Sequence, residues 1–275
     1  MGGMRALRVR ASRVVAIWFF AVQCASAEGG NADIAAAANQ ATISVGGMHQ
    51  NYKEFNDGIT ILLPSVLDSE LGSLLTFEVG ASRLTEKIFY EVQVGIAAGT
   101  TTYTGYLQDL GPPVVYTPYV GKTANFIVGA RGRVGIPFRP AAGLLLVPYA
   151  EVGEHLWRRD LGYVEDYSHF LIGVGGKLYW NPAPRVVVEA GLGTGTTFLA
   201  NMTLDDLDFE LGGKPWHHGL LAIDYRLDER WHLRLSSEYR RWQYGQSPVV
   251  AGFIEPRSES VQATYLISVG YSLLR

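Results

Sequence analysis

The residues of this chain whose side chains could transfer protons are its six histidines and its scattered carboxylates. His169 follows Asp166 by three residues, and Asp205 is followed directly by Asp206. A histidine beside a carboxylate can act as a general base, provided that the groups lie within about 3 Å of each other and of a substrate. Nothing in the spacing brings these groups together, so the sequence predicts no catalytic residues and no enzyme.

Carboxylates are concentrated in three segments that we expect to be loops, and such clusters can bind Ca²⁺ or Mg²⁺. None has the spacing and glycine of a helix–loop–helix calcium site. We therefore expect a solvated acidic surface, with no metal and no cofactor. The three groups are Asp205, Asp206, Asp208 and Glu210; Asp160, Glu165 and Asp166; and Glu54, Asp57, Asp68 and Glu70.

The elements that carry most other charged residues have an alternating pattern. In residues 263–273, apolar side chains fall on one face and mostly small or polar residues fall on the other. Residues 189–197 show a glycine-rich version of the same pattern. A strand with one apolar and one polar face suits lipid outside and a polar lumen inside.

About ten such segments follow one another. The predicted strands are 42–55, 73–84, 87–107, 123–137, 144–159, 166–181, 185–200, 209–227, 230–245 and 260–274. Their connections are alternately short and mostly longer, as in outer-membrane barrels with short periplasmic turns and longer external loops. The sequence thus predicts an all-β fold, a transmembrane antiparallel up-and-down β-barrel of about ten strands, with 8 or 12 as alternatives.

The face that we assign to the lumen carries six acidic and six basic residues. Unpaired buried charge is costly, so we expect these side chains to form ion pairs. A barrel of this size is narrow and largely filled by side chains, so the network would plug it; the alternative is a narrow ion path. The predicted lumen charge network is Glu78, Glu91, Arg131, Arg133, Glu151, Lys177, Glu189, Asp224, Arg226, Arg234, Glu238 and Arg240.

Pairing about the short turns places opposite charges across from each other, which stabilises antiparallel strands. The expected pairs are Lys177 with Glu189, Asp224 with Arg234, and Arg131 with Glu151.

Aromatic residues should mark the two membrane interfaces. We predict a periplasmic aromatic girdle of Tyr90, Trp180, Tyr225, Trp231 and Tyr271. At the external end we expect Trp157, Tyr163, Phe198 and Trp216.

The N-terminus has the features of a cleaved secretory signal. Four arginines precede the apolar residues 14–22, and Ala25-Ser26-Ala27 is a small-residue cleavage site. We predict a signal peptide at 1–27, a flexible lead-in at 28–41 and the barrel at 42–275.

Removal of the signal lowers the 23 basic residues by four arginines to 19, against 26 acidic residues, so the net charge becomes −7. This balance argues against a nucleic-acid partner. The only cysteine, Cys24, lies within the signal, so no disulfide or thiolate metal site is expected.

The C-terminal segment Tyr265–Arg275 resembles the closing strand of outer-membrane barrels, with Gly270 and Leu273 matching part of its assembly signal. The usual last residue is phenylalanine, and Arg275 departs from it, which concerns insertion rather than fold. Four other segments resemble a broad group of uncharacterised proteobacterial outer-membrane β-barrels, similar in style to the opacity proteins and the membrane domain of outer-membrane protein A. These segments are Tyr103–Gln108, Trp157–Asp160, Tyr163–His169 and Phe253–Pro256.

The resemblance implies insertion by the barrel assembly machinery and contact with outer-membrane lipids and lipopolysaccharide. It supplies no catalytic residues. The Asp-x-His pairing of omptin proteases and the His-x-Ser motif of barrel lipid A deacylases are both absent from this sequence.

We therefore expect a monomeric, non-enzymatic barrel with a charge-plugged lumen and an envelope-structural or surface-interaction role, toward an extracellular ligand that the sequence does not identify. The alternative is a narrow porin-like channel for ions or small solutes, and a rim hydrolase is least favoured. A hydrolase would place His169 or His217 within hydrogen-bond reach of a carboxylate at the external rim.

Overall fold

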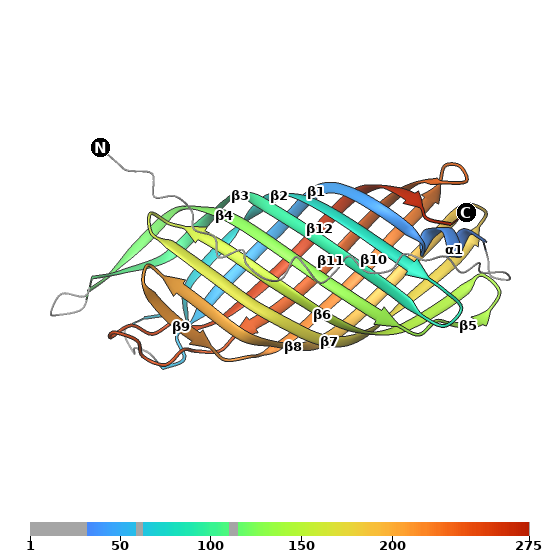
Figure 1. The fold of residues 1–275 in the computed structure, drawn as a ribbon. Helices are drawn as coiled ribbons and strands as arrows, with labels where there is room; N and C mark the ends of the chain where they lie inside the picture. Colours follow the sequence, from blue (N-terminus) through green and yellow to red (C-terminus); the bar gives the residue numbers. More distant parts are fainter. Residues whose placement is uncertain (1–31, 59–62, 110–114, 275) are drawn as a thin grey trace.

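A computed structural model describes residues 32–58, 63–109 and 115–274 (Figure 1). The predicted signal peptide and Arg275 lie outside the described residues. The elements are α1 (Ala32–Ala37), β1 (Gln40–Phe55), β2 (Val66–Leu84), β3 (Phe89–Asp109), β4 (Val115–Gly135), β5 (Phe138–Ala141), β6 (Leu144–Asp160), β7 (Val164–Ala183), β8 (Val186–Leu204), β9 (Leu207–Leu211), β10 (Pro215–Arg226), β11 (Trp231–Tyr244) and β12 (Arg257–Ser272).

Ten antiparallel strands close into a barrel, which confirms the predicted fold class. The order is β10-β11-β12-β1-β2-β3-β4-β6-β7-β8, and β8 pairs with β10 to close the ring. The short strands β5 and β9 lie outside it, paired with β6 and β8. Because side chains alternate along a strand, β6 buries Val147 and Tyr149 in the lumen and exposes Leu146 and Val152.

The barrel has two unlike ends. We call the end with α1 and the short connections between strands the turn end, and the opposite end, with the longer connections, the loop end (Figure 1). Several strands continue further toward the loop end than predicted: β2 begins at Val66 and β4 at Val115. Beyond the apolar band, the outer face no longer needs apolar residues, so the alternation that marks a strand in the sequence fades while the backbone ladder continues.

The register corrects two of the three expected pairs. Asp224 does lie opposite Arg234. Lys177 instead lies opposite Gly191, and Arg131 lies opposite Gly153. A shift of two residues keeps every side chain on the same face, so the lumen assignment is unaffected. The turn between β7 and β8 contains an irregularity after Trp180, which explains the first shift.

The expectation of a flexible lead-in at 28–41 is wrong for its described part. Residues 32–37 form α1, and β1 starts at Gln40. Ile34 and Ala37 pack against the inward-facing side chains of Phe89, Leu145 and other residues at the turn end. Burial of these apolar side chains holds the segment in place at the turn end of the barrel. Its alanine-rich composition alone had suggested a mobile segment. No helix in the described ranges is long and apolar enough to cross a membrane.

Candidate functional site

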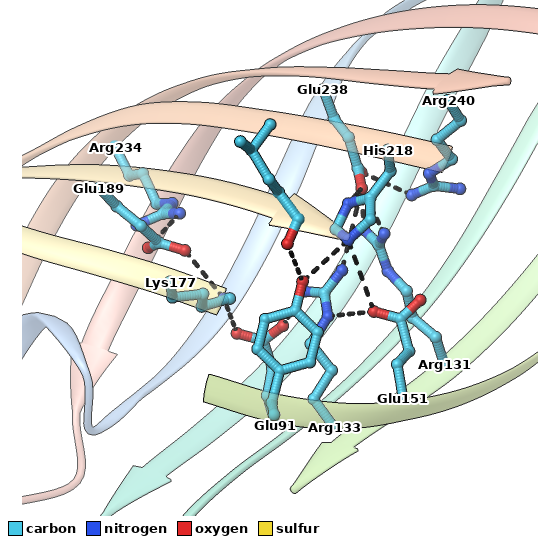
Figure 2. Close-up of polar contacts among 12 residues, drawn as sticks. Glu91, Arg131, Arg133, Glu151, Lys177, Glu189, His218, Arg234, Glu238 and Arg240 are labelled. Atoms are coloured by element: carbon cyan, nitrogen blue, oxygen red, sulfur yellow. Dashed lines mark hydrogen bonds and ion pairs between the residues drawn. The ribbon is translucent and has the colours of Figure 1, made fainter. Parts of the chain in front are cut away.

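The lumen near the turn end is crossed by an ion-pair network, which we call the ion-pair layer (Figure 2). Arg133, only 1% exposed at its side chain, pairs with both Glu91 and Glu151. Lys177 pairs with Glu91 and lies 2.8 Å from Glu189. Each basic group thus contacts two acids, which is the arrangement that offsets the cost of burying charge.

The layer continues to neighbouring strands. Arg234 Nη2 lies 2.7 Å from Glu189 Oε2. Arg131 makes two contacts with Glu238, and Arg240 Nη2 lies 2.6 Å from the same carboxylate. The ion-pair layer is therefore Glu91, Arg131, Arg133, Glu151, Lys177, Glu189, Arg234, Glu238 and Arg240.

Three other residues of the predicted network face the lumen and are placed differently. Glu78 borders both cavities described below and makes no ion pair with a described residue. Asp224 lies 2.6 Å from His232 and accepts a hydrogen bond from Gln40. Arg226 reaches Asp33 of α1 at 2.9 Å, so it fastens the helix to the barrel.

His218 also joins the layer, although no role in the lumen was predicted for it. Its Nδ1 lies 3.3 Å from Glu238 Oε1, and its Nε2 lies 2.8 Å from the hydroxyl of Tyr149. Its position could have indicated this, because His218 lies six residues before Asp224 on an alternating strand and therefore on the same inward face.

An aromatic layer fills the lumen on the loop-end side of the ion pairs. The rings of Tyr52, Trp157 and Tyr167 lie 5.0 to 6.1 Å apart, and Trp157 donates a 2.6 Å hydrogen bond to Asn125. The complete aromatic layer is Tyr52, His155, Trp157, Tyr167, His169, Trp216, Trp242 and Tyr244, each at most 6% exposed. The expectation that Trp157 and Trp216 mark the external interface is wrong, because both point into the lumen.

An acid cluster lies around one guanidinium beyond the aromatic layer. Arg159 Nη1 lies 2.7 Å from Glu165 and 3.4 Å from Glu54, and its Nε lies 3.1 Å from Glu70. Asp68 accepts a 3.3 Å hydrogen bond from Tyr103. These four carboxylates are at most 9% exposed.

The solvated acidic surface predicted from the sequence is therefore wrong for Glu54, Asp68, Glu70 and Glu165. The strands extend beyond the membrane-length segments, so inward positions there are still enclosed. The prediction of a solvated surface agrees with the exposure of Asp57, Asp205, Asp206, Asp208 and Glu210.

Among the small cavities between the described lumen side chains are two that border Glu78. One, of about 50 Å³, is bordered by Glu78, His155 and Trp242. The other, of about 30 Å³, is bordered by Glu78, Arg234 and Ser268. A water molecule needs about 10–15 Å³ by this measure, so each cavity can hold only a few waters.

His169 and His217 have partners other than the carboxylate that a rim hydrolase would require. His169 Nδ1 lies 2.7 Å from the hydroxyl of Tyr244, and its ring stacks on His155. His217 is on the outer face, with Nδ1 2.9 Å from Thr194 Oγ1. Within the described ranges, neither histidine contacts a carboxylate, and no group of three or more ligating side chains is arranged to hold a metal.

The five residues of the predicted aromatic girdle lie on the outer face near the turn end. Trp180, Tyr225 and Trp231 are about half exposed. Tyr90 and Tyr271 are less exposed, and Tyr271 packs against Trp231 with ring centroids 5.1 Å apart.

No protein-family model and no curated protein matches the sequence. Solved structures match its fold. The outer-membrane protease OmpT from Escherichia coli aligns with a TM-score of 0.58 at 8% identity, over 85% of this chain and 96% of that chain. The outer-membrane protein OprG from Pseudomonas aeruginosa aligns with a TM-score of 0.39 at 12% identity, over 86% of this chain and 97% of that chain.

At such low identity, the OmpT match bears on the fold alone, and it agrees with the resemblance seen in the sequence. The chain has the fold of an outer-membrane β-barrel.

Proposed function

We propose that this protein is a monomeric outer-membrane barrel with a closed lumen, and that it acts in envelope structure or as a surface for an extracellular ligand. The observation that carries this proposal is that layers of buried side chains follow one another along the lumen, with only small cavities between them. From the turn end, α1, the ion-pair layer, the aromatic layer and the acid cluster follow one another.

The orientation follows from the signal-like N-terminus and the unlike ends. The turn end, with its short connections and aromatic girdle, faces the periplasm, and the loop end faces the outside. Insertion then depends on the barrel assembly machinery, and the outer face contacts lipids and lipopolysaccharide.

Single-channel recording of the refolded mature chain in planar bilayers tests this proposal. We expect the wild type to be silent, because two independent layers block the lumen. The double variant Lys177→Ala/Trp157→Ala thins both layers and is expected to show openings. Arg241→Ala is the matched control, since it breaks an outer-surface pair with Glu259 and leaves the lumen intact.

Steady wild-type conductance would overturn the proposal. It would make the lumen the functional site, as a narrow channel for ions or small solutes.

A further inference from the structure

The connection between β11 and β12, residues 245–256, folds back over the loop end, and we call it the mouth loop. Val250 and Phe253 exchange two backbone hydrogen bonds of 2.8 and 2.9 Å. Ala251 and Gly252 between them have φ values of 51° and 89°, as in a tight type I′ hairpin turn. Val250 and Phe253 also pack against the buried cluster that contains the tryptophans and tyrosines of the aromatic layer. The loop is therefore a compact unit seated on the lumen.

Glu255 is the only charged residue of the mouth loop. Its side chain enters the barrel and accepts a 2.7 Å hydrogen bond from the hydroxyl of Tyr167. Ser247 donates its backbone N–H to the Glu255 carbonyl at 3.0 Å, and its hydroxyl accepts the Glu255 N–H at 2.9 Å. Glu255 is 7% exposed, so it joins the loop to the acid cluster.

The surroundings of Glu255 are strongly acidic. The titratable groups that face Glu255 are Tyr52 and Glu54 from β1, Arg159 from β6, and Glu165 and Tyr167 from β7. Asp68, Tyr103 and Tyr163 interact in turn with Glu54 or Arg159, and Glu70 pairs with Arg159. Arg159 is the single cation among them. Its side-chain ion pairs go to Glu54, Glu70 and Glu165 and not to Glu255.

This position suits a neutral carboxyl and not a carboxylate. Burial, with the nearby Glu54 and Glu165, raises the pKa of Glu255 well above its usual range. Once the loop lifts away, water solvates the Glu255 carboxyl, and the burial that raised its pKa is lost. Closing the loop therefore takes up a proton, and opening releases it.

We propose that the mouth loop is a proton-latched lid: with Glu255 protonated it covers the loop end, and as the pH rises, loss of that proton releases it. The lid deepens the proposed function and rests on its orientation, because it decides when the acid cluster, and the aromatic layer beneath it, are offered to an extracellular ligand. One released proton makes the open-to-closed ratio rise by up to about tenfold per pH unit.

The distance between two spin labels measures the lid directly. Val249 lies at the exposed tip of the loop, and Lys122 is exposed on β4. The sequence after residue 27 contains no cysteine, so Val249→Cys and Lys122→Cys can be labelled specifically in the refolded chain in lipid nanodiscs. Between about pH 5 and about pH 9, we expect one narrow distance in acid and a growing second population in base.

Two glutamine variants in this labelled background assign the proton. Glu255→Gln imitates the protonated carboxyl and should keep the narrow distance throughout. Glu259→Gln is the matched control, because Glu259 pairs with Arg241 on the outer face at 2.6 Å, and it should respond to pH as the unsubstituted background does. An unchanged distance across the pH range, or a Glu255→Gln variant that still opens in base, would overturn the lid.

Conductance recorded at the same two pH extremes separates this inference from the closed-lumen function. Lid movement in a silent barrel supports both. Lid movement with conductance overturns the closed lumen and keeps the lid, whereas a rigid loop on a silent barrel overturns the lid alone.

Discussion

Replacement of Arg133 by methionine is expected to lower the free energy of unfolding by about 3–5 kcal/mol, because it leaves the buried Glu151 without its arginine and Glu91 with Lys177 alone. Arg133 contacts Glu91 and Glu151, and all three side chains are at most 9% exposed. Methionine keeps much of the apolar volume, so the loss reports the charge more than a cavity. Urea unfolding of the barrel in lipid vesicles, followed by tryptophan fluorescence, gives this free energy.

Two further variants show whether the charge is responsible. Arg241→Met removes an arginine from an outer-surface pair in which the guanidinium is 46% exposed, and it should cost at most about 1 kcal/mol. The double variant Arg133→Met/Glu151→Leu should recover much of the loss, because an apolar replacement of a buried pair is often neutral. Equal costs for Arg133→Met and Arg241→Met would contradict the structural role of the ion-pair layer.

The fold could be read from the sequence because one constraint acts on every strand. Lipid contact requires an apolar outer face, and the lumen tolerates polar residues, so the period of two is repeated around the ring. The same parity placed Glu151 and Lys177 in the lumen, and both are buried there. Strand ends were less predictable, since the outer face above the membrane is polar.

The partners of the lumen charges could not be read from neighbouring-strand arithmetic. Arg131 on β4 contacts Glu238 on β11 across the bore, 107 residues away in sequence. Such contacts depend on the curvature and shear of the closed barrel, which a single hairpin does not contain.

The aromatic layer and acid cluster were missed although their parity was visible. Trp157 and Arg159 follow Glu151 at even spacing along β6 and therefore share its inward face. Because this region lies near the end of a predicted strand, it was expected to be the external membrane interface followed by a loop. In a barrel that extends beyond the membrane, such a position is still inside.

Replacement of Arg159 by methionine is expected to have an effect of similar size but with a marked pH dependence. Among the residues that the structure describes, Arg159 is the only cation in contact with Glu54, Glu70 and Glu165. Its loss should cost about 3–5 kcal/mol when these groups are ionised. The measurement is the same urea unfolding, made at about pH 8 and about pH 5.

The sign of the pH effect follows from proton binding. Without the guanidinium, the enclosed carboxyl groups hold protons more tightly in the folded barrel than in the unfolded chain. Stability of the variant must then fall as the pH rises, so the deficit relative to wild type should be smaller in acid.

The neighbouring residue supplies the control. Arg158 points outward and pairs with Asp166, with side chains 37% and 46% exposed. Arg158→Met should cost at most about 1 kcal/mol. A deficit for Arg159→Met that is the same at both pH values would mean that lost packing against Tyr52 and Trp157, and not the uncompensated acids, accounts for the destabilisation.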